Sequence, residues 1–134
     1  MEAHHARLLV VEDTIPIRHL VHELLEEAGF TDIDEAGDGS VAMEMLREVP
    51  YDLIITDWQM PRMNGLALVN AVRHWPERQH IPMLVLSGSM PHDALAAGAD
   101  VVVTKPFTSA ELLGKVRELV EGVPGHGGIP APGI

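Results

Sequence analysis

The sequence contains no cysteine and has few basic residues. Without cysteine the chain forms no disulfide and no thiolate site, which is typical of a protein that works in the cytoplasm. Nine Lys and Arg residues face twenty Asp and Glu residues, so the formal net charge is −11 at pH 7. A polyanion of this kind repels nucleic-acid phosphates and anionic lipids, so we expect neither nucleic acid nor a membrane as a direct partner.

Long apolar runs are also missing from the sequence. A membrane-spanning helix needs about 18 or more consecutive apolar residues, and no stretch approaches that length. No basic segment followed by an apolar leader is present, so we do not expect secretion. With 134 residues, the chain is long enough to form one domain with its own hydrophobic core.

What the sequence does contain is a series of short apolar segments that alternate with helical periodicity. Five strands are predicted, at residues 7–11, 31–36, 53–56, 82–89 and 101–107. Most of these strands are continuously apolar, and such strands are buried on both faces. The sequence therefore predicts an α/β protein with a parallel, doubly wound sheet between two layers of helices.

Five helices are predicted between and after the strands. The apolar positions recur at helical spacing over 17–28, 41–49, about 65–73, a short segment near 91–99, and 112–120. Leu20 and Val41 count among the positions expected to face the core. Thr108 and Glu111 form the pattern of a capping box at the start of the last helix. Residues 1–6 are expected to be an N-terminal extension, 7–121 the domain, and 122–134 a flexible Gly/Pro-rich tail or linker.

Polar residues follow four of the predicted strands, at the point where each strand ends. They are Glu12 and Asp13, Asp57, Ser87 with Gly88, and Thr104 with Lys105. In a doubly wound sheet, ligands bind beyond the carboxyl ends of the strands, so these side chains should meet at one edge. Each carboxylate taken alone could be a helix cap and Lys105 a solvated lysine, but their joint occurrence favours a site.

Three carboxylates in one place need a proton or a cation. Two carboxylates 4 Å apart repel by about 4 kcal/mol at an effective dielectric constant near 20. All-oxygen ligands without histidine or cysteine favour a hard ion such as Mg²⁺. A cation and a carboxylate beside a lysine and a hydroxyl favour phosphoryl transfer, with Asp57 as the acceptor.

The motifs "LLVVEDT", "YDLIITDWQMPRMNG", "LVLSGS", "GAD" and "TKPF" occur in this order between residue 7 and about residue 121. Together they resemble the receiver domain of bacterial two-component response regulators, a chemotaxis-regulator-like family. The resemblance implies a flavodoxin-like sheet with strand order 2-1-3-4-5. It also implies a phosphorylation-operated signalling module that catalyses only its own phosphorylation and dephosphorylation and is otherwise not an enzyme.

The resemblance implies a role for each matching residue. Asp57 would be the phosphoacceptor, and Mg²⁺ would be held by Asp13, Asp57 and the backbone carbonyl of Gln59, with Glu12 acting largely through water. Ser87 would bind the phosphoryl group and sense it, and Lys105 would pair with it from a cis Lys105–Pro106 peptide. The amides of Trp58 and Gly88 would help to hold the phosphate.

The resemblance also implies a phosphoryl donor: a phosphohistidine on a sensor histidine kinase or a histidine phosphotransfer protein. The docking surface would comprise Thr14, Ile15, Pro16, Arg18, His19, Pro106 and Phe107. Core packing is an equal alternative for Ile15. His19 and His22 lie three residues apart and could share a metal, but we expect a solvated helix face there.

Two features depart from the family pattern. The aromatic residue that usually precedes the lysine by three positions is Val102 here, so the usual rotamer switch between Ser87 and that aromatic cannot operate in its ordinary form. Ser87 and Lys105 are only 105 − 87 = 18 residues apart, so the fourth helix must be short or irregular. The family's usual output surface therefore does not transfer to this chain.

Other functions compete with this interpretation. An aspartyl-phosphate phosphohydrolase would need a second Asp at the position of Gln59, and a flavodoxin relative would need a hydroxyl/glycine loop where "VEDTIP" stands. A constitutive interaction module remains open because of Val102 and the short fourth helix. We expect a stand-alone regulator with an unknown output protein, with a relay intermediate and a receiver fragment of a larger regulator as alternatives.

Overall fold

The computed structural model describes residues 4–60, 62–88 and 92–121. Within them, one parallel sheet has the order β2-β1-β3-β4-β5, which confirms the predicted fold and strand order. The strands are β1 (His4–Val11), β2 (Phe30–Ala36), β3 (Leu53–Asp57), β4 (Met83–Ser87) and β5 (Val101–Thr104).

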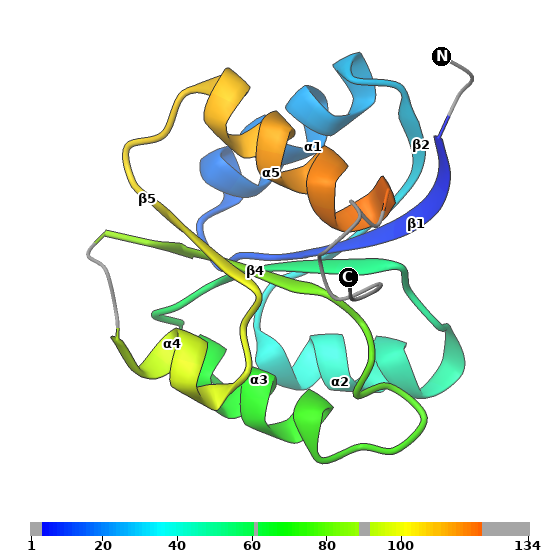
Figure 1. Ribbon diagram of the computed structural model, residues 1–134, viewed down its shortest axis with the longest axis vertical. Coiled ribbons are helices and arrows are strands. Elements are labelled where there is room, and N and C mark those ends of the chain that lie inside the picture. Colours follow the sequence, from blue (N-terminus) through cyan, green and yellow to red (C-terminus); the bar gives the residue numbers. More distant parts are fainter. Residues whose placement is uncertain (1–3, 61, 89–91, 122–134) are drawn as a thin grey trace, which may run out of the picture.

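Helices cover both faces of the sheet. They are α1 (Ile15–Glu27), α2 (Gly39–Glu48), α3 (Gly65–Arg73), α4 (His92–Ala97) and α5 (Ser109–Glu121). The helices α1 and α5 lie together on one face, and α2, α3 and α4 lie on the other (Figure 1). Among the described residues, no helix has both the length and the apolar character needed to span a membrane.

The core forms two layers because each strand sends alternate side chains to opposite faces. On β3, for example, Ile54 joins the cluster under α2, α3 and α4, whereas Leu53 and Ile55 join the cluster under α1 and α5. These side chains have no exposed surface. Burying one such side chain stabilises the fold by about 1.5–3 kcal/mol. Continuous apolar strands are therefore what a sheet with two covered faces requires.

Several predicted boundaries and core positions were wrong. The first strand begins at His4, so part of the predicted N-terminal extension belongs to β1, and the last strand ends at Thr104 instead of residue 107. Leu20 and Val41 are 46% and 40% exposed, because α1 and α2 bury narrower stripes than the periodicity suggested. The predicted tail at 122–134 lies outside the described residues.

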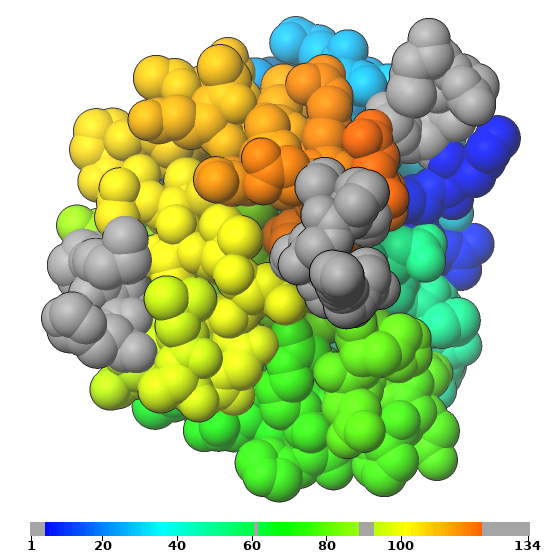
Figure 2. Space-filling view, in the orientation of Figure 1, coloured from blue at the N-terminus to red at the C-terminus, as the bar shows by residue number. Residues whose placement is uncertain are grey.

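The fourth helix is short, as the spacing between Ser87 and Lys105 predicted. It contains six residues, and β5 follows it after a turn at Gly98, whose φ of 121° is a conformation that favours glycine. The strand β5 lies at the end of the sheet order. In the space-filling view, β5 and α4 (yellow) lie at the surface beside α5 (orange) (Figure 2). This edge of the sheet is therefore open to solvent.

Candidate functional site

The residues that follow the strands meet at the carboxyl edge of the sheet. Pairing of β1, β3, β4 and β5 in one register places Val11 opposite Thr56, Asp57 opposite Leu86, and Ser87 opposite Thr104. Because neighbouring strands in a sheet lie about 4.8 Å apart, the side chains just beyond these positions share one site. The order of the strands therefore places Glu12, Asp57, Ser87 and Lys105 along one edge of the sheet, and the long side chain of Lys105 extends past β4 to reach Asp57.

Three carboxylates and one ammonium form the centre of this site. One oxygen from each of Glu12, Asp13 and Asp57 lies within 4.8 Å of the others. The Lys105 Nζ atom is 3.1 Å from Asp57 Oδ1 and 3.6 Å from Glu12 Oε1. A single positive charge thus faces three negative ones. The remaining negative charge makes this an environment for a cation.

Burial makes the charge of Glu12 costly. Glu12 has no exposed surface, and Asp57 is only 7% exposed. Burial, with smaller contributions from the charges of Asp57 and Asp13, raises the pKa of the Glu12 carboxyl, although the Thr14 amide and Lys105 act in the opposite direction. Its Oε1 atom accepts no hydrogen bond from the described residues. This buried, under-coordinated oxygen and its two neighbouring carboxylates fit the ligand preferences of Mg²⁺.

The Asp57 carboxylate is held from two sides. The Trp58 amide donates to Asp57 Oδ1 at 2.9 Å, and Lys105 Nζ donates to the same oxygen. Ser87 is 4% exposed at the end of β4, and its carbonyl accepts a 2.7 Å hydrogen bond from the Lys105 amide. The Lys105–Pro106 peptide is cis, as the family resemblance predicted.

The glycine after Ser87 leaves open space beside the carboxylate site. A Cβ atom added to Gly88 would meet no atom of the described residues within 4 Å, and the residue itself is exposed. Gln59, two residues after Asp57, is also exposed. The cradling role of Gly88 and the metal-binding role of the Gln59 carbonyl remain predictions.

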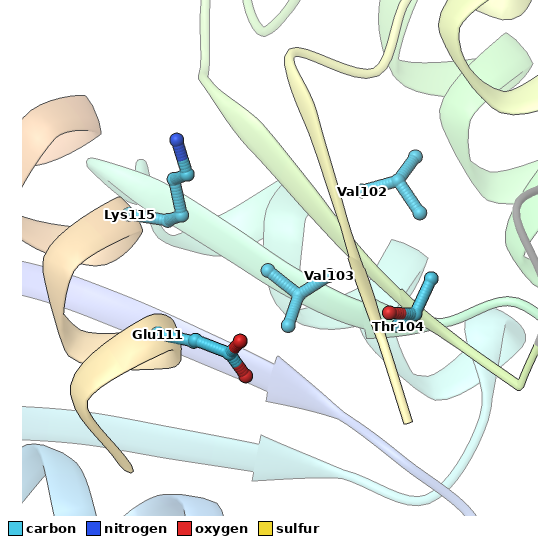
Figure 3. Close-up of a pocket in the computed structure, with 5 residues that line it drawn as sticks. All are labelled: Val102, Val103, Thr104, Glu111 and Lys115. Atoms are coloured by element: carbon cyan, nitrogen blue, oxygen red, sulfur yellow. The ribbon is translucent and has the colours of Figure 1, made fainter. Parts of the chain in front are cut away.

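Val102 lies on the edge strand, beside a cavity of about 200 Å³ that Val103, Thr104, Glu111 and Lys115 also line. Figure 3 shows Val102 and Val103 pointing to opposite sides of β5, with Glu111 and Lys115 of α5 on the Val103 side. Val102 packs against the cluster under α2, α3 and α4, and Val103 belongs to the cluster under α1 and α5. The expectation that switching differs from the usual form stays a prediction.

An apolar cavity overlaps part of the predicted docking surface, at Pro106 and Phe107. This cavity of about 370 Å³ is lined by Ile17, Leu20, Lys105, Pro106 and Phe107. The cavity lies between α1 and the loop after β5, and the docking role of this region stays a prediction. Leu20 was expected to face the core instead, whereas Ile17, which was also expected there, packs against the cluster under α1 and α5 as well as lining the cavity. Their spacing of three residues on an amphipathic helix could equally have indicated a surface stripe.

Three other predicted positions on α1 differ in their surroundings. Ile15 is 54% exposed, so it is a surface residue and not a core residue. Arg18 turns inward, because its guanidinium donates to Glu35 Oε1 and to the Glu12 carbonyl, each at 2.9 Å. His19 is exposed and lies 4.0 Å from Glu35. The Arg18 side chain therefore stabilises the packing of α1 on the sheet and is not free to contact a partner.

The sequence mispredicted the surroundings of one residue, His22, and gave no indication of one pair, Asp38–Arg62. His22 is not on a fully solvated face, because its Nδ1 atom lies 2.6 Å from Glu35 Oε2 and its Nε2 atom 3.3 Å from Glu26. Asp38 is fully buried and pairs with Arg62. The sequence signal for Asp38 was its place before Gly39 and Ser40, which is typical of a helix cap. Nothing in the sequence linked it to Arg62.

Comparison with known proteins agrees with this fold and site. The chain matches the family model of the response regulator receiver domain over residues 8–117. It is 37% identical over 123 residues to the chemotaxis protein CheY of Pseudomonas aeruginosa, covering 89% of this chain and 99% of that protein. It is 34% identical over 119 residues to CheY-3 of Vibrio cholerae, covering 86% and 92% of the two chains.

Solved structures show the same similarity. The signal receiver domain of a signal transduction histidine kinase from Syntrophus aciditrophicus superposes with a TM-score of 0.82 and 34% identity, covering 88% of this chain and 92% of that one. The chemotaxis response regulator CheY4 of Vibrio cholerae gives a TM-score of 0.80 and 32% identity, covering 85% and 98%. The chain therefore belongs to the response regulator receiver domain family of two-component signalling.

Proposed function

We propose that this receiver accepts a phosphoryl group on Asp57 from a phosphohistidine, in a Mg²⁺-dependent reaction, and thereby switches the binding of a partner. The observation that carries the proposal is the contact of Lys105 Nζ with Asp57 Oδ1, at 3.1 Å, beside the carboxylates of Glu12 and Asp13. An acceptor, a fixed cation and a place for a second cation are the parts that phosphoryl transfer requires.

The chemistry assigns one task to each group. A carboxylate oxygen of Asp57 attacks phosphorus, the P–N bond to the donor imidazole breaks, and the imidazole keeps the bonding electrons. The Lys105 ammonium neutralises the phosphoryl oxygens, while the Ser87 hydroxyl and the amides of Trp58 and Gly88 donate hydrogen bonds to them.

Bound Mg²⁺ would supply further charge neutralisation for the same phosphoryl oxygens. Asp13, Asp57 and the Gln59 carbonyl would hold it, with Glu12 acting through water. The buried Glu12 oxygen without a hydrogen bond is the structural feature that supports this ligand set. Hydrolysis of the aspartyl phosphate by water would reset the protein.

The test compares the parent with Asp57→Asn after incubation with Mg²⁺ and acetyl phosphate. Intact-mass measurement should show one phosphoryl adduct on the parent and none on the variant. Asp93→Asn, which changes an exposed carboxylate on α4, is the matched control and should keep the adduct. If neither acetyl phosphate nor a phosphohistidine donor produced an adduct, the constitutive interaction module would be the better account.

The proposed donor-docking surface is the apolar cavity between α1 and the loop after β5. Leu20 is 46% exposed there, so Leu20→Ala removes contact area with little effect on the core. Phosphotransfer from a histidine phosphotransfer domain should slow by about three- to tenfold. Phosphorylation by acetyl phosphate, which needs no docking, should not change. Leu95→Ala, at another exposed leucine, is the control.

We also propose that the protein works as a single-domain regulator whose output is an interaction with another protein. The similarity to chemotaxis protein CheY, of which this chain covers 99%, supports this form. The similarity to the receiver of a histidine kinase supports the alternative of a receiver within a larger protein. An immunoblot of the native product would decide between them by its size.

A further inference from the structure

The described parts of the loop between β3 and α3, residues 58–60 and 62–64, carry two groups that the proposed function uses: the Trp58 amide and the Gln59 carbonyl. Hydrogen bonds fix this loop at both ends. At its base the Gly65 amide donates to the Trp58 carbonyl at 2.9 Å, and at its far end the Gly39 amide of α2 donates to the Met63 carbonyl at 3.1 Å. The loop is therefore attached to α2 as well as to β3.

Asp38, the N-cap of α2, makes the second attachment. Its Oδ1 atom accepts hydrogen bonds from the Ser40 amide, the Ser40 hydroxyl and the Val41 amide, at 2.8, 2.7 and 3.1 Å. Its Oδ2 atom accepts from Arg62 Nε at 2.8 Å and also from Arg62 Nη2. The carboxylate has no exposed surface. One oxygen thus caps the helix, and the other binds the loop.

The backbone of Arg62 needs such an attachment. Its φ is 63°, in the left-handed region that residues with side chains seldom adopt and that persists only where the surroundings hold it. The fit against α2 is also tight, because a Cβ atom on Gly39 would lie 2.6 Å from the Met63 carbonyl oxygen. The ion pair and the backbone contact together hold a conformation that the loop would not favour alone.

We propose that Asp38 and Arg62 act as positioning residues: their ion pair holds the loop so that the Trp58 amide and the Gln59 carbonyl face the phosphorylation site. This inference rests on the proposed function. Neither residue touches the reacting atoms. Their contribution is that the loop is ordered before Mg²⁺ and phosphate bind, so that the ordering does not reduce the binding affinity.

Matched variants separate this role from capping of α2. Asp38→Ser keeps a good N-cap but loses the ion pair. Arg62→Gly loses the ion pair and at the same time relieves the left-handed backbone. Arg62→Lys keeps the positive charge, so its Mg²⁺ affinity should lie between that of the parent and that of Arg62→Gly. Arg7→Ala removes a different pair of the same 2.8 Å length, Arg7–Asp32, which joins β1 to β2, and is the control.

The measurement is the Mg²⁺ dissociation constant, followed by Trp58 fluorescence in a Trp75→Phe background. Asp38→Ser and Arg62→Gly should each raise the constant by about tenfold, as the loss of groups that orient metal ligands commonly does. The double variant should bind Mg²⁺ with the same affinity as either single variant, because both substitutions remove the same ion pair. Arg7→Ala should leave the constant unchanged.

The outcomes distinguish the two proposals. If the parent binds Mg²⁺ and accepts phosphate, but Asp38→Ser and Arg62→Gly bind Mg²⁺ as tightly as the parent, the positioning role is wrong and the proposed function stands. The positioning role is also wrong if the variants lose stability to urea without any change in Mg²⁺ affinity, which is what a purely structural pair predicts. If the parent binds no Mg²⁺, the proposed function fails and the positioning role fails with it.

Discussion

At the scale of single residues, the buried charge of Glu12 is a group of the site that destabilises the fold. Folding buries this carboxylate completely and raises the pKa of its carboxyl. A raised carboxyl pKa means that folding favours the neutral form, so the charge destabilises the folded protein at neutral pH. We expect Glu12→Gln to increase the free energy of unfolding by about 1 kcal/mol in the absence of Mg²⁺.

Urea unfolding at pH 7 with a chelator present would measure this effect. Asp13→Asn provides the comparison, since Asp13 is exposed and its neutralisation should change the stability by less than about 0.5 kcal/mol. A loss of stability in Glu12→Gln would contradict the interpretation, because it would mean that the charge is stabilised by its neighbours.

Asp38 is the opposite case among the acidic residues. Hydrogen bonds from Ser40 and the Arg62 guanidinium hold the pKa of the Asp38 carboxyl well below its usual range. A lowered carboxyl pKa stabilises the folded state at every pH above the unfolded value of about 4, and the contribution is lost as the pH falls below that value. The stability difference between the parent and Asp38→Asn should therefore be constant from pH 7 to pH 5 and shrink below about pH 4.

Urea unfolding of both proteins across this range is the measurement. Glu44→Gln, at an exposed position on the same helix, should show no comparable change. A stability difference that persisted undiminished at low pH would mean that the Asp38 carboxylate is not the source of the stabilisation.

At the scale of the elements, the hydrogen bonds of a single arginine, Arg73, hold the region around the short helix α4 in place. Arg73, at the end of α3, donates to the carbonyls of Gly98, Gln79 and Ile81 and to Asp100 Oδ2, at 2.7–2.9 Å. These bonds connect α3 to the segments on either side of β4 and α4. A helix of six residues has little stability of its own, so this connection holds the region in place.

Arg73→Lys should lower the free energy of unfolding by about 2–4 kcal/mol, because one ammonium cannot replace a planar guanidinium that serves several carbonyls. Arg47→Lys, at an exposed position in the last turn of α2, is the matched control and should have little effect. Chemical unfolding of both variants measures the difference. Equal stability of the two would show that α4 is held by apolar packing instead.

The elements also show where prediction from sequence works and where it fails. The capping box was predicted from Thr108 and Glu111, and both reciprocal hydrogen bonds are present at 2.9 and 3.0 Å. This interaction is local, so a short stretch of sequence contains all of it. The positions of Leu20 and Arg18 were mispredicted because their surroundings depend on β2 and on the loop after β5, which are remote in the sequence.

At the scale of the whole molecule, the unbalanced charge of the site should link stability to metal binding. A cation that binds only the folded state stabilises it by RT ln(1 + [Mg²⁺]/Kd), which is about 1.4 kcal/mol at ten times Kd. We therefore expect the urea midpoint of the parent to rise with Mg²⁺ at constant ionic strength. Asp57→Asn should show a much smaller rise. An equal rise in both proteins would indicate general screening of the −11 net charge.

The order of strands and helices, the parallel sheet, and the residues that end the strands could all be predicted from the amino-acid sequence. These features depend on local patterns: apolar runs, helical spacing, and polar residues at strand ends. The grouping of Glu12, Asp13, Asp57 and Lys105 in one site was predictable too, because strand order is enough to bring strand ends together.

The pairing of polar groups across distant segments depends instead on the tertiary structure. The Arg18–Glu35, Asp38–Arg62 and Arg73–Asp100 pairs join residues that are 17, 24 and 27 positions apart. Ion pairs over such distances follow from how helices and loops pack on the sheet, and no periodic pattern encodes them. Packing is also the reason that Leu20 faces solvent beside Phe107, because the width of the buried stripe on a helix depends on the surface it covers.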